Sequence, residues 1–320
     1  MRYLIRRILH GLFLLLGGSL LTFVLTQLAP GDFFQEIRLN PQISPATVDA
    51  LRAQYGMDQP FATRYVLWVK SVIDGDFGFS FAYGTPVATL LWPRVRNTLF
   101  LAITAAALAW LIALPAGIWC AGRRGGWPDR LCAAGTSTLL AIPDLILSLG
   151  LLFLAVRTGY LPTGGMISVG FDDLNLPGKV RDIAAHLALP CSALVLSTLP
   201  MLVRHVRTGM VEVLDAPFVR TAVAHGIPRQ RLLWRQVLPN AANPLISLFG
   251  ISFGTLLSAS RLIEVVMSWP GLGPLLLEAI LARDMYLVVG AITFSTVFLV
   301  AGNLIADLLL YAADPRIRRP

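Results

Sequence analysis

The sequence predicts an all-α integral membrane protein with six transmembrane helices. Of its 320 residues, 56% are apolar and only 14% are charged, and the mean hydropathy is +0.69. A soluble domain cannot bury this much apolar surface, and disordered chains have the opposite composition. The apolar residues form long runs, whereas outer-membrane barrels show short segments of alternating hydrophobicity. The membrane segments are therefore expected to be helices.

Six apolar runs approach or exceed the roughly 20 residues that cross a bilayer as a helix. The first run, Ile8–Leu28, follows Arg2, Arg6 and Arg7 and so resembles a signal peptide. It is longer than the apolar core of about 7–15 residues in such peptides, so we expect an uncleaved first span. The other five expected spans are Leu99–Cys120, Leu131–Val156, Leu187–Arg207, Ala241–Val266 and Tyr286–Ala312.

The distribution of charge predicts that the N- and C-termini are both cytoplasmic. An even number of spans places both termini on one side of the membrane. The segments expected on that side hold fifteen Lys or Arg and four acidic residues, against ten and eleven on the other side. Cytoplasmic loops carry such an excess of basic residues. The rule also accounts for the net charge of +8, so a lipid bilayer is expected as a partner and nucleic acid is not.

A long segment, 29–98, is expected outside the cytoplasm. Within it, Ser44 can cap a helix that has Pro45 at its first position and stops at Gly56. A second, amphipathic helix is expected from Pro60 to Ile73. A structured cap over the ends of the spans and a docking surface for an extracytoplasmic partner are both compatible with this pattern.

The loop 208–240 is too polar to cross a membrane and is expected in the cytoplasm. Pro217 can start a short helix and Gly226 can end it, after which a second helix begins at Arg229. A short helix with an apolar face, held outside the bilayer, suits insertion into a groove of a partner protein. An amphipathic helix that lies on the lipid surface fits the same pattern.

At this loop the sequence resembles the inner-membrane permeases of ATP-binding-cassette (ABC) importers. The stretches 218–227 and 232–241 are similar to the EAA loop of the dipeptide, oligopeptide and nickel permease family. Further stretches resemble that family in the same order along the chain: Arg2–Ile8, Leu28–Asp32, Leu51–Pro60, Gly75–Ser80, Gly159–Gly164, Glu264–Gly273 and Asp314–Arg316.

The resemblance implies a single permease domain over residues 1–320, with the type I ABC importer permease fold, in the bacterial inner membrane. It also implies that the short helix in the 208–240 loop couples the permease to an ATPase subunit. The residues expected to carry this coupling are Phe218, Val219, Arg220, Thr221, Ala222, His225 and Gly226. Phe218 and His225 stand where the family usually has a tyrosine and a basic residue, a difference that could tune which ATPase is accepted.

The partners that the resemblance implies are a second homologous permease, two ABC ATPase subunits and an extracytoplasmic substrate-binding protein. The binding protein is expected to dock on the outer loops, at Trp269, Pro270, Gly271 and Gly273 among others. Short peptides are the expected substrates, with nickel chelates, antimicrobial peptides and oligosaccharides as alternatives. A stand-alone secondary transporter, an exporter of the same architecture and a membrane anchor for a cytoplasmic partner are the other classes considered.

The sequence carries no motif for catalysis of its own. Gly178 and Lys179 are followed by Val180 and lack the preceding glycine of a phosphate-binding loop. No metal-ligand cluster is evident among the four scattered histidines. We therefore expect a transport subunit and not an enzyme, without a cofactor of its own, with ATP and Mg²⁺ bound by the partner ATPases.

Ionisable residues within spans are costly and are candidates for a transport pathway or gate. They are Asp144, Arg261, Glu264 and Asp307. A structural reading stands beside each: Arg261 and Glu264 share a helix face and can form an ion pair, Asp307 can cap a helix or pair with an arginine, and Asp144 can pair inside the bundle.

Overall fold

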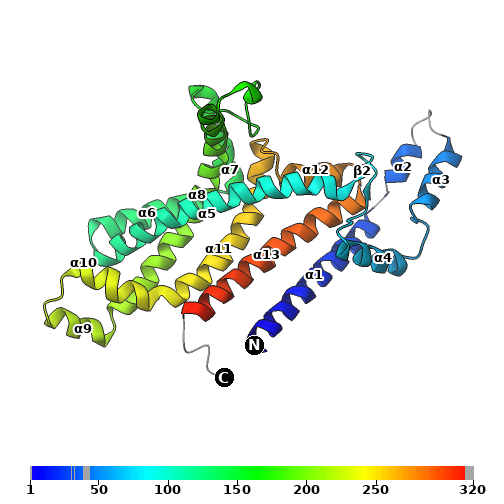
Figure 1. Cartoon of the computed structure of the whole chain (residues 1–320). Coiled ribbons are helices and arrows are strands. Elements are labelled where there is room, and N and C mark those ends of the chain that lie inside the picture. Colours follow the sequence, from blue (N-terminus) through cyan, green and yellow to red (C-terminus); the bar gives the residue numbers. More distant parts are fainter. Residues whose placement is uncertain (1, 30, 32, 39–43, 314–320) are drawn as a thin grey trace. The chain divides into compact units, whose positions relative to one another are not determined.

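The computed structural model describes residues 2–29, 31, 33–38 and 44–313 (Figure 1). These residues form two compact units, the first made of residues 1–98 and 270–300 and the second of residues 99–269 and 301–320. Two of the three divisions fall within long helices, α5 (Val87–Gly122) and α13 (Met285–Ala313), and the third falls between Trp269 and Pro270. The expected single domain over the whole chain stays a prediction.

Five stretches of the described chain are long and apolar enough to cross a membrane, and they correspond to five of the expected spans. They centre on α1 (Arg2–Leu28), α5, α8 (Leu176–Leu214), α11 (Leu238–Val266) and α13. Two helices begin well before the apolar runs that predicted them, α5 at Val87 and α8 at Leu176. In α8 the side chain of Asn175 caps the start by accepting a hydrogen bond from the Gly178 N–H.

The third expected span, Leu131–Val156, is not one straight helix. It consists of α6 (Trp127–Ala141) and α7 (Asp144–Thr158), whose axes differ by 97°. The break lies at Pro143, which takes the extended backbone that precedes a helix and has no N–H to continue the ladder from α6. The bent pair counts as a sixth span only if both halves together cross the membrane.

The first unit contains the short elements of the 29–98 segment. The helix α3 (Pro45–Gln54) begins and ends as expected, because Ser44 Oγ accepts from the Thr47 N–H at 3.2 Å and Gly56 has φ +65°. The amphipathic helix α4 (Phe61–Ile73) is also confirmed. Four elements were not predicted: α2 (Phe33–Arg38), the antiparallel strands β1 (Phe79–Ser80) and β2 (Thr85–Pro86), and α12 (Leu272–Leu281).

A buried carboxylate ties the β1–β2 hairpin to the start of α13. Asp284 is fully buried and accepts hydrogen bonds from Ser80 Oγ at 2.6 Å and from the Ala82 N–H at 3.1 Å. It also accepts from the Leu287 N–H at 3.3 Å, which caps the first turn of α13. Near it, Trp68 of α4 packs on Phe23 of α1 and donates its indole N–H to a backbone carbonyl.

The second unit is organised around α8, which packs against α6, α7 and α11. Close approach of α5 to α8 depends on Gly117, because a Cβ there would lie 2.6 Å from a methyl group of Val206 and 3.1 Å from the Arg207 nitrogen. After α7, the segment that leads to η1 (Phe171–Asp173) passes the end of α11, where the Gly165 N–H donates to the Ser268 carbonyl.

Candidate coupling loop

The short helix expected in the 208–240 loop is α9 (Pro217–Ala224), and its bounds confirm the prediction. Pro217 stands at the first helical position, where its missing N–H costs nothing. Gly226 has φ +71°, the left-handed conformation that ends helices and that side chains disfavour. A Cβ at Gly226 would meet no atom within 4 Å, so this position is constrained by backbone conformation and not by space.

The seven candidate coupling residues divide between two faces of α9. Val219 and Ala222 are only 4% and 9% exposed and belong to a hydrophobic cluster of the second unit. That cluster also contains Ile118, Val206, Met210, Leu232, Leu233 and Val237. Phe218 and Val223 flank this buried face on its two sides and are 43% and 58% exposed. Four other candidates are also exposed: Arg220, Thr221, His225 and Gly226. One face therefore anchors the helix, and the rest of its surface is accessible.

The chain that follows α9 is helical up to the next span. The single turn α10 (Arg229–Leu232) leads into a π-helical turn, η2 (Leu233–Val237), and then into α11. Leu232, Leu233 and Val237 are buried against the same cluster as α9, while Trp234 stays exposed. A π-helical turn inserts one residue into an α-helix and commonly occurs at functional sites.

Two ion pairs hold the parts of the chain that flank this loop. Asp129, at the start of α6, is 6% exposed and accepts from Arg207 Nε at 2.5 Å and Nη2 at 2.8 Å. The Gly125 N–H donates to the same carboxylate at 2.9 Å. The second pair joins Arg124 to Asp215 at 2.9 Å, and both of its side chains are more than half exposed. The first pair locks α6 to α8, and the second joins the 123–126 turn to the end of α8.

The four candidate pathway residues are not gathered into one site. Glu264 is fully buried near the end of α11, whereas Asp144 is exposed at the first position of α7. Asp307 follows Ala306, which packs against Gly250 of α11. Glu264 lies fourteen positions beyond Gly250, a rise of about 21 Å along a helix, so it is far from Asp307. Arg261 is half-buried one turn before Glu264, and the expected ion pair between them stays a prediction.

The candidate docking residues near α12 are mostly inaccessible. Trp269 is fully buried, and Gly271 and Gly273 are buried as well. Pro270 is half-buried, and its carbonyl accepts a hydrogen bond from Asn97 Nδ2 at 2.8 Å. These four residues shape their own loop in the structure, and docking of a partner there stays a prediction. The expected motifs Leu28–Asp32 and Asp314–Arg316 lie partly or wholly outside the described residues.

Comparison with known families decides the identity of the chain. The family described as "Binding-protein-dependent transport system inner membrane component" matches residues 113–319, and the corresponding N-terminal family matches residues 1–102. The chain belongs to this family. It is an ABC importer permease of the peptide group and a multi-pass protein of the inner membrane, a transport subunit and not an enzyme.

Relatives resemble the permease over its full length. The oligopeptide transport system permease protein AppB of Bacillus subtilis (strain 168) is 35% identical, over 98% of each chain. The dipeptide transport system permease protein DppB of Escherichia coli (strain K12) is 32% identical, over 99% of each chain. The inward-facing MetNI methionine ABC transporter shares the fold, with a TM-score of 0.58 at 18% identity, over 70% of the permease and 96% of the solved chain. The expected type I importer permease fold is thereby confirmed.

Sequence reasoning missed the residues that hold the coupling loop in place. In the sequence, the arginines of the 121–130 loop indicate only the orientation of the permease, and Asp129 contributes only one acidic charge to that count. The useful signal was an acidic residue three positions after a glycine pair, Gly125 and Gly126, in the first turn of a helix. The partner, Arg207, is remote in sequence, and only the packing of α6 on α8 brings it close.

Proposed function

We propose that this permease forms a translocation path for short peptides together with a second homologous permease, and that α9 couples the path to an ATPase subunit. That the permease belongs to a peptide importer is established by its relatives. The coupling role of α9, the composition of the complex and the orientation in the membrane are the new parts.

The observation that carries the proposal is the two-faced burial of α9. Val219 and Ala222 fix the helix to the ends of the spans, while Phe218 and Val223, on the two sides of this buried face, stay exposed. Exposed apolar residues on a helix that is already anchored fit insertion into a groove of a partner. Phe218 supplies the kind of aromatic anchor that dominates protein interfaces.

The anchoring also explains how motion would pass from the partner to the spans. The buried face of α9 packs on residues of α5 and α8, and the Asp129–Arg207 pair joins α8 to α6. A displacement of α9 would therefore move the ends of α5, α6 and α8 together. ATP binding, which closes the two ATPases, would in this way switch the bundle between inward-open and outward-open states.

The orientation follows from charge. The loops 121–130 and 204–240 are rich in arginine, which places α9 on the cytoplasmic side together with both termini. ATP and Mg²⁺ are bound there by the partner ATPases. A substrate-binding protein delivers peptide from the opposite side.

The proposal is tested by isolating the permease from its native membrane and reconstituting what travels with it. We expect a second permease and ATPase subunits, and, with the binding protein added, ATP-dependent uptake of a radiolabelled tripeptide into proteoliposomes. Uptake of nickel chelate or oligosaccharide, with none of peptide, would overturn the substrate assignment. Peptide uptake by the permease alone, driven by an ion gradient and unaffected by ATP, would establish a secondary transporter instead.

A further inference from the structure

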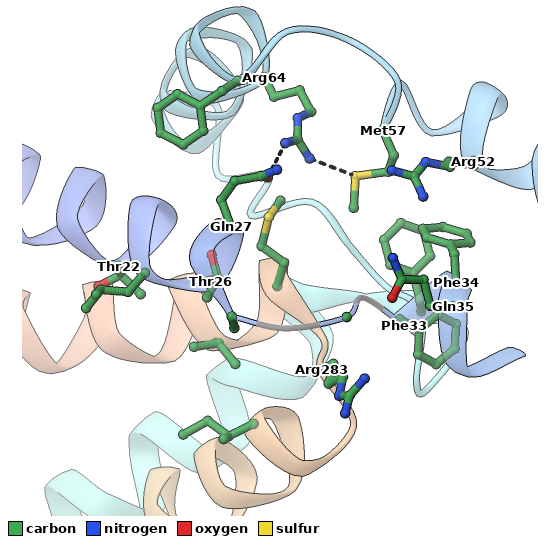
Figure 2. A pocket seen from close by; sticks show the side chains of 18 of the residues that line it. Thr22, Thr26, Gln27, Phe33, Phe34, Gln35, Arg52, Met57, Arg64 and Arg283 are labelled. Carbon is green, nitrogen blue, oxygen red and sulfur yellow. Dashed lines mark hydrogen bonds between the residues drawn. The ribbon is translucent and has the colours of Figure 1, made fainter.

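A cavity of about 800 Å³ lies within the first unit (Figure 2). It is lined by the end of α1, by α2, by the chain between α3 and α4, and by the turn between α12 and α13. Its size is in the range of about 300–1,000 Å³ that is typical of sites for small ligands. Nothing in the coupling role of α9 uses this cavity.

The most unusual group in the cavity wall is the guanidinium of Arg64, on α4. Arg64 is only 9% exposed, and its Nε is buried without a hydrogen-bond partner. Its Nη2 donates to Gln27 Oε1 and its Nη1 lies 3.6 Å from Met57 Sδ, as the dashed lines in Figure 2 show. A neutral amide and a thioether are weak partners for a buried cation, which normally meets a carboxylate.

The other charges of the lining do not compensate Arg64. Arg52 and Asp58 form an ion pair with each other at 2.9 Å, so they contribute no net charge. Arg283 adds a second cation from the α12–α13 turn, on the opposite side of the cavity from Arg64 (Figure 2). Within the part of the chain that the structure describes, neither Arg64 nor Arg283 forms an ion pair. The described side chains of the lining therefore carry a net positive charge.

The remaining wall combines polar side chains, among them Thr22, Thr26, Gln35 and Gln59, with apolar side chains from the ends of helices. Leu25 belongs to α1, Ile280 to α12, and Val288 and Ile292 to α13. A ligand that fits has one anionic group for Arg64 and an apolar body for these side chains. A short peptide of apolar residues with a free C-terminal carboxylate has this form.

We propose that the cavity binds the C-terminal carboxylate of a short peptide through Arg64, with the apolar side chains of the peptide against the helix ends. This inference rests on the proposed import of peptides and adds a recognition site within the permease itself. A carboxylate can accept charge-assisted hydrogen bonds from a guanidinium, and it is a stronger partner than the amide and the thioether that Arg64 contacts now.

The test compares the peptide trileucine with its C-terminal amide, which lacks the carboxylate. The full-length permease is held in nanodiscs of phosphatidylcholine, and binding is followed by saturation-transfer-difference NMR. Because a charge-assisted hydrogen bond discriminates strongly, we expect the free acid to bind about tenfold more tightly than the amide. The preference should fall below about twofold in Arg64→Gln.

A second variant tests the same contact in case Arg64→Gln fails to fold. Gln27→Glu keeps Arg64 and places a carboxylate where the amide oxygen now accepts its hydrogen bond. This internal anion should occupy the guanidinium and also abolish the preference for the free acid. Gln54→Glu and Arg96→Gln make the same charge changes at exposed positions outside the lining and should leave the preference intact.

Several outcomes would overturn the inference. Equal affinity for acid and amide in the wild-type permease, absence of binding, or an unchanged preference in both cavity variants would each do so. A further outcome would assign the cavity to a lipid phosphate. In this outcome, peptide binding is lost in discs that contain phosphatidylglycerol, and the wild-type permease retains that lipid whereas Arg64→Gln loses it. If the reconstituted complex imports peptide in any of these cases, the proposed import function is retained and only the carboxylate site at Arg64 is rejected.

Discussion

The surroundings of α9 and the cavity of the first unit use arginine in opposite ways. Around α9, Arg207 and Arg124 are each paired with a carboxylate of the same chain. In the first unit, Arg64 is more deeply buried than either of them, yet it meets only an amide and a thioether. The burial of an arginine therefore does not indicate its role, whereas the chemical nature of its hydrogen-bond partner does.

Under the two proposals, the difference separates a part that transmits motion from a part that receives a ligand. Paired arginines complete their hydrogen bonds internally and make the loop around α9 rigid. An arginine that lines a cavity and has no carboxylate partner in the protein can bind the anionic group of a ligand.

The largest effect is expected on transport, from Gly226→Asp. The left-handed backbone at Gly226 accepts Asp and Asn about equally well, so Gly226→Asn is a matched control for conformation. The aspartate adds a negative charge to the exposed end of α9, close to the negative end of the helix dipole. We expect the aspartate variant to assemble in the membrane but to lose at least about 90% of ATP-dependent peptide uptake, a cost of roughly 1.4 kcal/mol or more in coupling.

The asparagine variant should keep most of its uptake, measured in the same proteoliposomes. Wild-type uptake by Gly226→Asp would contradict the coupling role of α9. Equal loss in both variants would show that the backbone at this position, and not its charge, controls transport.

The next effect concerns stability, through the two ion pairs near α9. Asp129→Asn removes a charged acceptor from a nearly buried site and leaves Arg207 without its carboxylate. We expect the free energy of unfolding to fall by about 2–3 kcal/mol. Asp215→Asn makes the same change in an exposed pair and should cost less than about 1 kcal/mol. Unfolding in mixed micelles with increasing dodecyl sulfate measures both values, and equal losses would refute the ranking.

A smaller effect is expected from the buried carboxylate of the first unit, which has no arginine partner. Asp284→Ala removes the acceptor for Ser80 Oγ and for two backbone N–H groups, one of them in the first turn of α13. By analogy with other helix caps, the loss should be about 1–2 kcal/mol. Asp49→Ala, at an exposed position of α3, is the control and should change stability little.

The smallest effect is a pH dependence at Tyr83. Its phenol donates a hydrogen bond to the Glu278 carboxylate, which raises the pKa of Tyr83 from 10.0 to about 12. Since the pKa is higher in the folded state, the stability from this bond is complete below pH 10 and is lost as the pH rises through 12. The difference between wild type and Tyr83→Phe in a titration of phenolate absorbance should therefore show a group with a pKa near 12. A difference centred on pH 10 would contradict this hydrogen bond.

Features encoded by neighbouring residues could be predicted from the sequence. Ser44 and Gly56 delimit α3, Pro217 and Gly226 delimit α9, and the predicted bounds agree with the structure. In each case a local residue satisfies or ends the backbone hydrogen bonds, so no distant contact is needed. The apolar runs likewise located the membrane helices.

Features that depend on distant residues could not be predicted in this way. The sequence shows Arg64 as one polar residue in an amphipathic helix, and only the packing of α1, α4 and the α12–α13 turn buries it beside a cavity. The division of α9 into a buried and an exposed face has the same origin. Pro143 is a local cause of the break in the third span, but the angle of 97° depends on how α6 and α7 each pack on α8.

The most direct test of the central claim is site-specific photo-crosslinking from the exposed face of α9. A benzoylphenylalanine at Val223, which is 58% exposed, is compared with one at Val180, which is 62% exposed at the start of α8. In native membranes, the proposed coupling predicts a crosslink from position 223 to an ATPase subunit and none from position 180. A crosslink from position 223 to lipid alone, or to the ATPase from both positions, would contradict it.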